Sequence, residues 1–482
     1  METEKPRVFS RRRSFEAQLV KICYCLRSLS HWTYHESIVL PLCEAGHNVT
    51  VLFDRKWSGK EPGDAAHRCA AQYPSLRIEW SLRRDDAWRA WLFSAREIRS
   101  YASYLRREGQ AEFYTRRWLG YLPRFVRWVA GFAWGRKLIA SGFAEKVFRA
   151  IEDRVPADAR IVAWLREERP DVVVASPTNL RFSEETEYLK AANELGIPTA
   201  LPVLSWDNLS TKGLINLRPD VLLAWNQMHA EEAEAIHGIP RDRIVITGAP
   251  FLDKWFRARS DEADGRELER QTGIDPCQPF VLYLGSSANI AKDESGLVLG
   301  LAKALRESDD PRLRAMTVLA RPHGANQGPF KAIDEPNVKI WLRDQLLPDT
   351  EEGFAAFSAA IRGSVAVVGL NTTGMVDAVL ADRPVIALLP EEYRRSNAAE
   401  AVHFKLLLDA EMYARARTPQ DCVPLLAALP GADARKDARR RFALNFVRPH
   451  GLDQPAGELA ARAIEKLAQR KASELADPCK PA

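Results

Sequence analysis

The sequence VAVVGLNTTGMVDA, residues 365–378, decides the fold class. Its first four residues, Val365–Val368, predict a buried β-strand, and the small polar residues that follow predict a turn into a helix. At a helix N-terminus the backbone N–H groups lack partners and the dipole is positive, which suits a diphosphate. We therefore expect Thr372, Thr373 and Gly374 to bind the phosphates of a nucleotide.

Asp377 lies one turn further along the same predicted helix. We expect its carboxylate to accept hydrogen bonds from the ribose hydroxyls of that nucleotide. An ordinary helix start would use the same residue types, with a threonine as N-cap and the aspartate opposing the dipole. The order of strand, small-residue turn and helix favours the binding interpretation.

Short apolar runs alternate with helical patterns on both sides of this unit. Strands separated by helices indicate parallel sheets that are covered on both faces. We therefore expect an α/β fold with two Rossmann-like domains whose parallel sheets face a central cleft. The other strands are predicted at residues 20–26, 49–53, 171–175, 199–203, 221–224, 244–247, 280–284, 316–321, 338–341 and 385–389.

The length of 482 residues agrees with two domains, because single cores rarely grow beyond about 250–300 residues. We expect an N-terminal acceptor domain at 1–256, a connection at 257–278, a C-terminal nucleotide-donor domain at 279–432 and a helical tail at 433–482. Residues 85–154 break the alternation of strands and helices. They are predicted to form a helical insertion in the first domain.

Composition places the chain among globular enzymes of a reducing compartment. Apolar residues make up 46% and charged residues 28% of the chain, which is ordinary for a globular protein. Seven cysteines with no CxxC pair argue against a disulfide framework or a zinc ribbon. No run of 18 uncharged apolar residues occurs, and the basic residues 1–13 lack the apolar stretch of a signal peptide. We therefore expect a cytoplasmic protein.

The net charge of +5 is concentrated in the predicted insertion. Residues 83–154 contain 16 Lys and Arg against 8 Asp and Glu, and five of the 13 tryptophans. Either the segment 118–137 contacts an anionic membrane at the inner face of the plasma membrane, or its tryptophans pack inward and its arginines are solvated. A nucleic-acid partner is not expected, because no recognition motif occurs. The membrane interpretation concerns Arg124, Arg127, Trp128, Trp134, Arg136 and Lys137.

Ligands of open α/β sheets bind beyond the carboxyl ends of the strands. Two loops in the second half follow strands in this way. Gly285, Ser286 and Ser287 can bring backbone N–H groups close to an anion, or they form an ordinary turn. Arg321 can hold phosphate through two parallel hydrogen bonds, and His323 can act as an acid–base group, unless the pair is a chance feature of a surface loop.

A loop in the first half, residues 205–213, is expected to face these groups from the other side. Asp207 is our candidate general base for an acceptor hydroxyl, and Lys212 is a candidate for neutralising phosphate. Trp206 and Asn208 complete the acceptor side. The alternative is a turn rich in hydrogen-bonding residues.

His31 and His35, in the first βα loop, are further candidate bases, with a loop or N-cap role as the alternative. No Asp-x-Asp, HExxH or clustered Cys/His set occurs, so no metal site is predicted. Arg321, His323 and the helix N-terminus would then stabilise the leaving diphosphate.

The sequence resembles the GT-B class of glycosyltransferases, and within it the CDP-glycerol glycerophosphotransferase-like and bacterial surface-carbohydrate proteins. The resemblance extends from about residue 169 to residue 457. Glycerophosphotransferases tend to show Trp-His-Gly-Thr-Pro where this chain has Trp206-Asp207-Asn208, a difference that favours sugar transfer. The similar stretches are 206–213, PDVLLAW at 219–225, ITGAP at 246–250, RPH at 321–323, NTTGMVDA at 371–378, RPVI at 383–386 and RPHGLDQP at 448–455.

The resemblance implies a metal-independent inverting glycosyltransferase without a cofactor. Its donor would be a nucleotide-activated sugar and its acceptor a lipid-linked glycan of bacterial surface polysaccharide or glycolipid synthesis. Three alternatives stay open: a CDP-glycerol-type polyol-phosphate transferase, a nucleotide-sugar 2-epimerase, and an inactive membrane-peripheral assembly protein.

Overall fold

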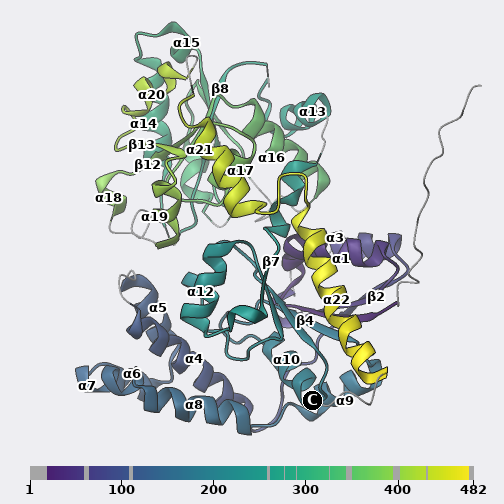
Figure 1. Cartoon of the computed structure of the whole chain (residues 1–482). Helices are drawn as coiled ribbons and strands as arrows, with labels where there is room; N and C mark the ends of the chain where they lie inside the picture. Colours follow the sequence, from purple (N-terminus) through teal and green to yellow (C-terminus); the bar gives the residue numbers. More distant parts are fainter. Residues whose placement is uncertain are drawn as a thin grey trace, which may run out of the picture.

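Runs of β-branched and aromatic residues build two parallel sheets in the computed structural model (Figure 1). The structure describes residues 19–58, 64–107, 112–257, 261–275, 277–288, 290–324, 326–342, 350–394, 402–429 and 433–476. The first sheet has the order β3-β2-β1-β4-β5-β6-β7 and the second β10-β9-β8-β11-β12-β13. The strands are β1 (Lys21–Leu26), β2 (Asn48–Phe53), β3 (Leu76–Trp80), β4 (Val172–Ser176), β5 (Thr199–Pro202), β6 (Val221–Ala224), β7 (Ile244–Ile246), β8 (Phe280–Leu284), β9 (Thr317–Arg321), β10 (Val338–Ile340), β11 (Ala366–Gly369), β12 (Val385–Leu388) and β13 (Tyr413–Ala416).

Helices cover both faces of each sheet, which explains why strands such as β4 and β8 are buried along their whole length. The helices of the first half are η1 (Leu29–His31), α1 (Trp32–Glu44), α2 (Arg55–Ser58), α3 (Asp64–Gln72), α4 (Arg89–Arg106), α5 (Glu112–Tyr121), α6 (Arg124–Ala130), α7 (Ala133–Ile139), α8 (Gly142–Arg154), α9 (Ala159–Glu168), α10 (Glu185–Glu194), α11 (Asn208–Thr211), α12 (Gln227–His237), η2 (Arg241–Arg243) and η3 (Pro250–Phe256). Those of the second half are α13 (Asp261–Thr272), α14 (Ser295–Arg306), α15 (Pro311–Arg314), η4 (Gly328–Ala332), α16 (Glu351–Gly363), α17 (Gly374–Leu380), α18 (Glu391–Arg394), α19 (Val402–Asp409), α20 (Cys422–Ala428), α21 (Lys436–Phe442), η5 (Ala443–Val447) and α22 (Ala456–Ala476).

The predicted fold class is confirmed, since two parallel α/β sheets face each other across a cleft. Every predicted strand is present to within about two residues of its expected ends. The prediction missed β3 and β13, which lie at the outer edges of their sheets. Edge strands are only partly covered, and β3 carries charged residues, so neither gives a continuous apolar run.

Two segments differ from the predicted domain limits. The stretch 257–278, expected to be a connection, contains α13, which packs along α16 of the second domain. The tail after residue 433 crosses back, and α22 packs along α1 of the first domain (Figure 1). Ala460 and Ile464 of α22 belong to the same buried cluster as strands β1 and β2. The first domain is therefore completed by the C-terminal helix.

A buried ion pair fixes this crossing. Arg448, in the RPHGLDQP stretch, donates through Nη2 to Oδ1 of Asp253 at 2.6 Å, and each side chain is 6% exposed. The same carboxylate accepts the N–H groups of Ala456 and Gly457 at the start of α22. A Cβ on Gly457 would lie 2.0 Å from the Ser37 carbonyl oxygen of α1, so only glycine allows this approach. We interpret the stretch as the contact that holds the tail against the first domain.

The predicted helical insertion is confirmed as α4–α8. Its inner side is joined to α10 of the first domain by buried charges: Arg96 Nη1 donates to Glu187 at 2.5 Å, and Lys190 Nζ donates to Glu152 of α8 at 3.1 Å. Burial by itself raises the pKa of Glu152, but the charges of Arg96 and Lys190 lower that pKa to about 2. Inward packing holds for Trp118, which is buried, whereas Trp128 and Trp134 are exposed, and the predicted membrane contact stays a prediction. No helix among the described residues is long and apolar enough to cross a bilayer.

Candidate functional site

Two hollows lie between the domains and share one wall. The first, of about 390 Å³, extends from η1 and α1 to α17. The second, of about 230 Å³, extends from α5 to the loops that follow β8, β9 and β11. Trp206, Asp207, Lys212 and Thr373 line both hollows. The predicted acceptor-side loop and the predicted donor loop are therefore brought together.

The loop 205–213 is held from two sides. His229 Nε2 donates to the carbonyl of Trp206 at 3.0 Å, and His237 Nε2 donates to the carbonyl of Leu209 at 2.9 Å. From the insertion, the Tyr104 hydroxyl donates to the carbonyl of Lys212 at 2.7 Å. Burial lowers the pKa of both histidines, to about 4 for His229 and about 3 for His237, so each is neutral at physiological pH. These contacts fix the loop backbone.

Asp207 occupies the junction of the two hollows. Ser205 Oγ donates to its Oδ1 at 2.7 Å, while Thr211 Oγ1 and Lys212 Nζ donate to its Oδ2 at 2.8 and 3.0 Å. Both members of the Asp207–Lys212 ion pair keep some solvent contact, with 20% and 26% of their side chains exposed. Hydrogen bonds to a carboxylate stabilise its charged form. The carboxylate is thus oriented by three donors and accessible from both hollows.

The two histidines of the first loop have different positions. His31 lines the larger hollow, and its Nδ1 lies 2.7 Å from the Ser28 hydroxyl. Burial and the charge of Arg27 lower its pKa to about 3, so the ring is neutral. His35 is 1% exposed, lies 2.8 Å from the Tyr24 hydroxyl and is not among the described residues that line either hollow. The structure therefore places His31, but not His35, in the cleft.

The predicted donor loop reaches the cleft through Asn371, Thr372 and Thr373. Thr373 makes no capping hydrogen bond to α17; its hydroxyl instead accepts from the Trp206 indole of the other domain at 3.4 Å. The alternative of a threonine N-cap is thus not realised at this position. A Cβ at Gly374 would lie 2.6 Å from Leu284 Cδ1, so the Leu284 side chain would have to shift to accommodate another residue.

His323 lines the smaller hollow, whereas Arg321 does not. The Arg321 guanidinium is buried between the rings of Phe357 and Trp341, at 4.1 and 4.4 Å from their centroids. The predicted contact between Arg321 and a diphosphate stays a prediction. The contact that the structure shows is a stacked cation that supports the loop carrying His323.

Asp377, like Arg321, is not among the described residues that line either hollow. It is 7% exposed, and its Oδ1 accepts the indole N–H of Trp255 at 2.6 Å. Burial raises its pKa to about 6, against the opposing charges of Lys254 and Arg321. This position gives the carboxylate a partner inside the protein, and the predicted ribose contact stays a prediction.

The three residues of the Gly285-Ser286-Ser287 turn have different roles. A Cβ on Gly285 would lie 2.9 Å from Pro322 Cα, so the glycine is needed for contact between neighbouring loops. Ser286 is fully buried, and its N–H donates to Glu294 at 2.7 Å. Only Ser287 lines the hollow. The first two residues shape the site, and the third faces it.

Helix α5 of the insertion forms a wall of the smaller hollow that the sequence analysis did not predict. Phe113, Tyr114 and Arg117 line it, and Arg117 Nη2 donates to the carbonyl of Thr211 at 2.7 Å. The only sequence signal was the aromatic and basic character of the whole insertion. That character does not distinguish a cleft wall from an outer surface.

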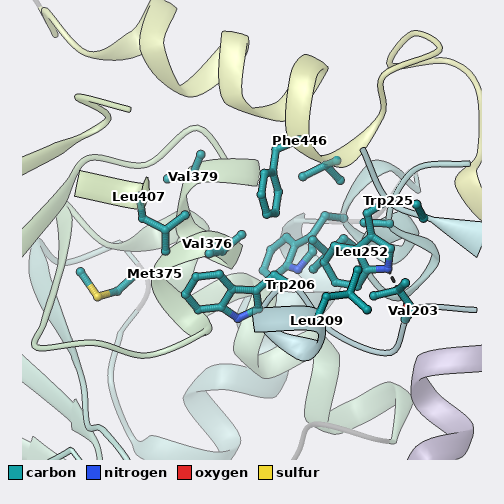
Figure 2. Close-up of a cluster of buried hydrophobic side chains, with 14 of the residues drawn as sticks. Val203, Trp206, Leu209, Trp225, Leu252, Met375, Val376, Val379, Leu407 and Phe446 are labelled. Carbon is teal, nitrogen blue, oxygen red and sulfur yellow. Dashed lines mark hydrogen bonds between the residues drawn. The ribbon is translucent and has the colours of Figure 1, made fainter. Parts of the chain in front are cut away.

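An apolar core closes the cleft from behind. Trp206 and Leu209 of the first domain pack in one buried cluster with Met375 and Val376 of α17 and with Phe446 (Figure 2). Because hydrophobic interfaces restrict domain motion, this contact fixes the relative position of the two halves around the site.

No family model matches the sequence. A search of curated proteins also gave no match. Solved structures of the same fold exist. A Methanocaldococcus jannaschii UDP-GlcNAc 2-epimerase has a TM-score of 0.52 at 13% identity, over 92% of this chain and 99% of that one. A Neisseria meningitidis UDP-GlcNAc 2-epimerase bound to UDP-GlcNAc has a TM-score of 0.50 at 11% identity, over 93% and 99%. A Listeria monocytogenes protein proposed to be such an epimerase has a TM-score of 0.53 at 11% identity, over 94% and 97%. The chain therefore has the GT-B-like, two-domain fold of these proteins.

Proposed function

We propose that this protein transfers a sugar from a nucleotide-activated donor to an acceptor hydroxyl. The observation that carries the proposal is the pair of hollows that meet at Asp207 and Lys212. A transferase must hold two substrates with their reacting atoms together, and two chambers with one shared wall provide that arrangement. The solved structures of this fold include UDP-GlcNAc complexes, so UDP-GlcNAc is the first donor to test.

Asp207 is the proposed general base, and Lys212 controls it. In the structure Lys212 Nζ donates to Asp207 at 3.0 Å. A donor diphosphate would compete for the same ammonium group. Movement of Lys212 toward the phosphates would remove one hydrogen bond from the carboxylate and make it a better proton acceptor. Donor binding would thereby activate the base.

The proposed donor contacts are Thr372, Thr373, Ser287 and His323, which line the smaller hollow. A thermal-shift titration with UDP, CDP, GDP and dTDP, each with Mg²⁺ or with EDTA, tests them. Ligand at 100 times its Kd stabilises a protein by about 2.7 kcal/mol. We expect one diphosphate to stabilise the protein equally with and without metal. Thr373→Ala should reduce that shift, and an unchanged shift would remove Thr373 from the site.

Asp207→Asn separates binding from chemistry. Loss of a general base typically costs a factor of about 10²–10⁴ in rate. We expect that loss in turnover with donor affinity nearly unchanged. His31→Gln is the matched comparison in the same cleft, since its ring is the second candidate base. If only His31→Gln abolishes turnover, the base is His31.

A 2-epimerase is the second candidate, because the solved structures above are epimerases. An epimerase acts on the donor alone. Incubating UDP-GlcNAc with the protein and following C2 inversion by NMR distinguishes the two functions. An epimer formed without acceptor would contradict the transferase proposal. Polyol-phosphate transfer is tested separately, by incubating the protein with CDP-glycerol and the expected acceptor, a lipid-linked glycan.

A further inference from the structure

The outer side of the insertion is an exposed aromatic face. Phe125, Trp128, Phe132 and Trp134, here called the aromatic row, have exposed fractions of 72%, 60%, 43% and 57%. Neighbouring rings in the row contact each other, with centroid separations of 6.0, 5.2 and 5.9 Å. Contiguous exposed apolar surface of this kind marks an interaction site on a protein. Two further apolar side chains of α7 and α8, Leu138 and Phe143, are 51% and 72% exposed.

The helices that carry the row are locked together. A Cβ on Gly135 of α7 would lie 1.9 Å from the Val129 carbonyl oxygen of α6, so the two helices are in backbone contact. Arg136 Nη1 donates to the carbonyl of Ala130 at 3.0 Å, at the C-terminus of α6. Tyr101, Trp118 and Ile139 form a buried cluster on the inner side of the insertion. The exposed rings are therefore carried by helices that are packed rigidly against each other.

The charge around the row has one sign. Residues 121–149 contain six Lys and Arg and one acidic residue, Glu145. That acid is paired with Arg99 and Arg149 at 2.9 and 3.0 Å and is only 20% exposed. The basic residues Arg124, Arg127, Arg136, Lys137 and Lys146 are exposed. Aromatic rings with exposed cations and almost no acid complement the interface of an anionic bilayer, where rings occupy the headgroup region and cations face the phosphates.

The aromatic row and one wall of the cleft belong to consecutive helices of the insertion. Helix α5 lines the smaller hollow and is joined to α6 by residues 122–123. In Figure 1 the insertion extends from the cleft side of the first domain to the outer end that α6 and α7 occupy. A bilayer against α6–α8 would therefore contact the same subdomain that supplies the α5 wall of the smaller hollow.

We propose that the α6–α8 face docks this protein on the surface of an anionic membrane through the aromatic row and its surrounding cations. The rings insert among the headgroups while the arginines and lysines contact lipid phosphates. This contact does not depend on which nucleotide-sugar reaction the cleft performs. It would place the open side of the cleft next to lipid-borne acceptors.

Vesicle co-sedimentation of the full chain tests the proposal without any turnover. Vesicles of phosphatidylcholine alone are compared with vesicles of phosphatidylcholine and phosphatidylglycerol, at low and high salt. We expect binding to the anionic vesicles that weakens at high salt, because the Debye length falls to about 3 Å at 1 M. Each cation near such a surface contributes about 1 kcal/mol, which is roughly fivefold in affinity. Arg124→Gln with Arg127→Gln should therefore weaken binding roughly 25-fold.

The aromatic variant, which combines Trp128→Ala and Trp134→Ala, should lose most of its binding to the anionic vesicles. Trp80→Ala is the matched control, since Trp80 is 45% exposed on the edge strand β3, outside the insertion. All these side chains are exposed, and unchanged thermal melting confirms that each variant folds. Absence of binding to anionic vesicles, or equal binding by the aromatic variant and the control, overturns the proposal. Sedimentation velocity without lipid decides the alternative: an oligomer that the aromatic variant dissociates would make this face a contact between copies of the chain.

Discussion

Replacing Asp377 by asparagine should stabilise the protein at neutral pH and leave its stability in acid nearly unchanged. In the folded protein burial raises the pKa of Asp377 to about 6, compared with 3.8 for an unperturbed aspartate. Below pH 3.8 the carboxyl is protonated in both states and adds no pH-dependent cost. As pH rises from 3.8 to 6, the unfolded state ionises first, which favours unfolding. Each pKa unit corresponds to 1.36 kcal/mol, so the cost reaches roughly 3 kcal/mol above pH 6.

Asparagine cannot ionise and therefore avoids this cost. Its side-chain oxygen can still accept the Trp255 indole N–H that Asp377 accepts at 2.6 Å. Urea unfolding of the Asp377→Asn variant and the wild type is compared at pH 4 and pH 7, with the indole fluorescence as probe. The difference in free energy of unfolding should grow by roughly 2–3 kcal/mol in favour of the variant. Asp309→Asn, at an exposed carboxylate of the same domain, should give a difference that is the same at both pH values.

A pH-independent difference for Asp377→Asn would refute the reasoning, because it would mean that burial does not suppress ionisation at this site. The same variant separates the two roles considered for Asp377. A carboxylate that contacts ribose hydroxyls would lose nucleotide affinity on conversion to the amide. A carboxylate whose contact is with Trp255 would not affect nucleotide affinity. We therefore expect unchanged UDP binding together with increased stability.

Three further outcomes follow from the packing and charge of the described residues. Gly285→Ala should lose about 1–3 kcal/mol of stability and weaken nucleotide binding, because the new Cβ displaces the loop that carries His323; Gly296→Ala, where the Cβ meets nothing within 4 Å, should be harmless in the same thermal melts. Arg96→Leu should lose about 3 kcal/mol in urea unfolding, because Glu152 and Glu187 each lose one of two buried cationic partners, whereas Arg116→Leu in an exposed ion pair should change little. Burial lowers the pKa of four histidines that are therefore neutral in the fold, so each should make the protein less stable as pH drops below 6.5. The histidines are His31, His35, His229 and His237. In urea unfolding, the stability of the His35→Gln variant relative to the wild type should therefore rise from pH 7 to pH 4, and a difference that is the same at both pH values would contradict the burial of His35.

Local signals predicted the strands and the loops at their ends, but not what each side chain in those loops contacts. The loop after β11 was placed correctly because its small residues follow a buried strand directly. Arg321 and Asp377 were expected in the same site, yet both are engaged behind it. Their positions depend on aromatic residues of α16 and η3, which are distant in sequence. No pattern within a loop indicates such partners.

The insertion shows why composition alone was ambiguous. Its tryptophans and arginines were open to two interpretations, and the structure divides them between two surfaces. Trp118 packs inside, Arg117 reaches the cleft, and Trp128 is exposed on the far side. Which residue takes which role depends on helix packing, because turning a helix by one residue moves a side chain by about 100° around the axis. Sequence periodicity over helices as short as α6 and α7 is too brief to fix that rotation.

This division of one subdomain into an inner and an outer surface connects the proposed chemistry to the proposed membrane contact. The buried ion pairs Arg96–Glu187 and Lys190–Glu152 join the insertion to α10 of the first domain, so its outer face has a fixed orientation relative to the cleft. If the aromatic row contacts a bilayer, the same subdomain contacts that surface and lines the smaller hollow through α5. A water-soluble acceptor would gain nothing from this arrangement, whereas an acceptor anchored in lipid would be concentrated at the cleft. We therefore expect vesicle-borne acceptors to be used more efficiently than the same glycans free in solution, and the Trp128→Ala, Trp134→Ala variant to lose that preference while keeping its activity on free glycans.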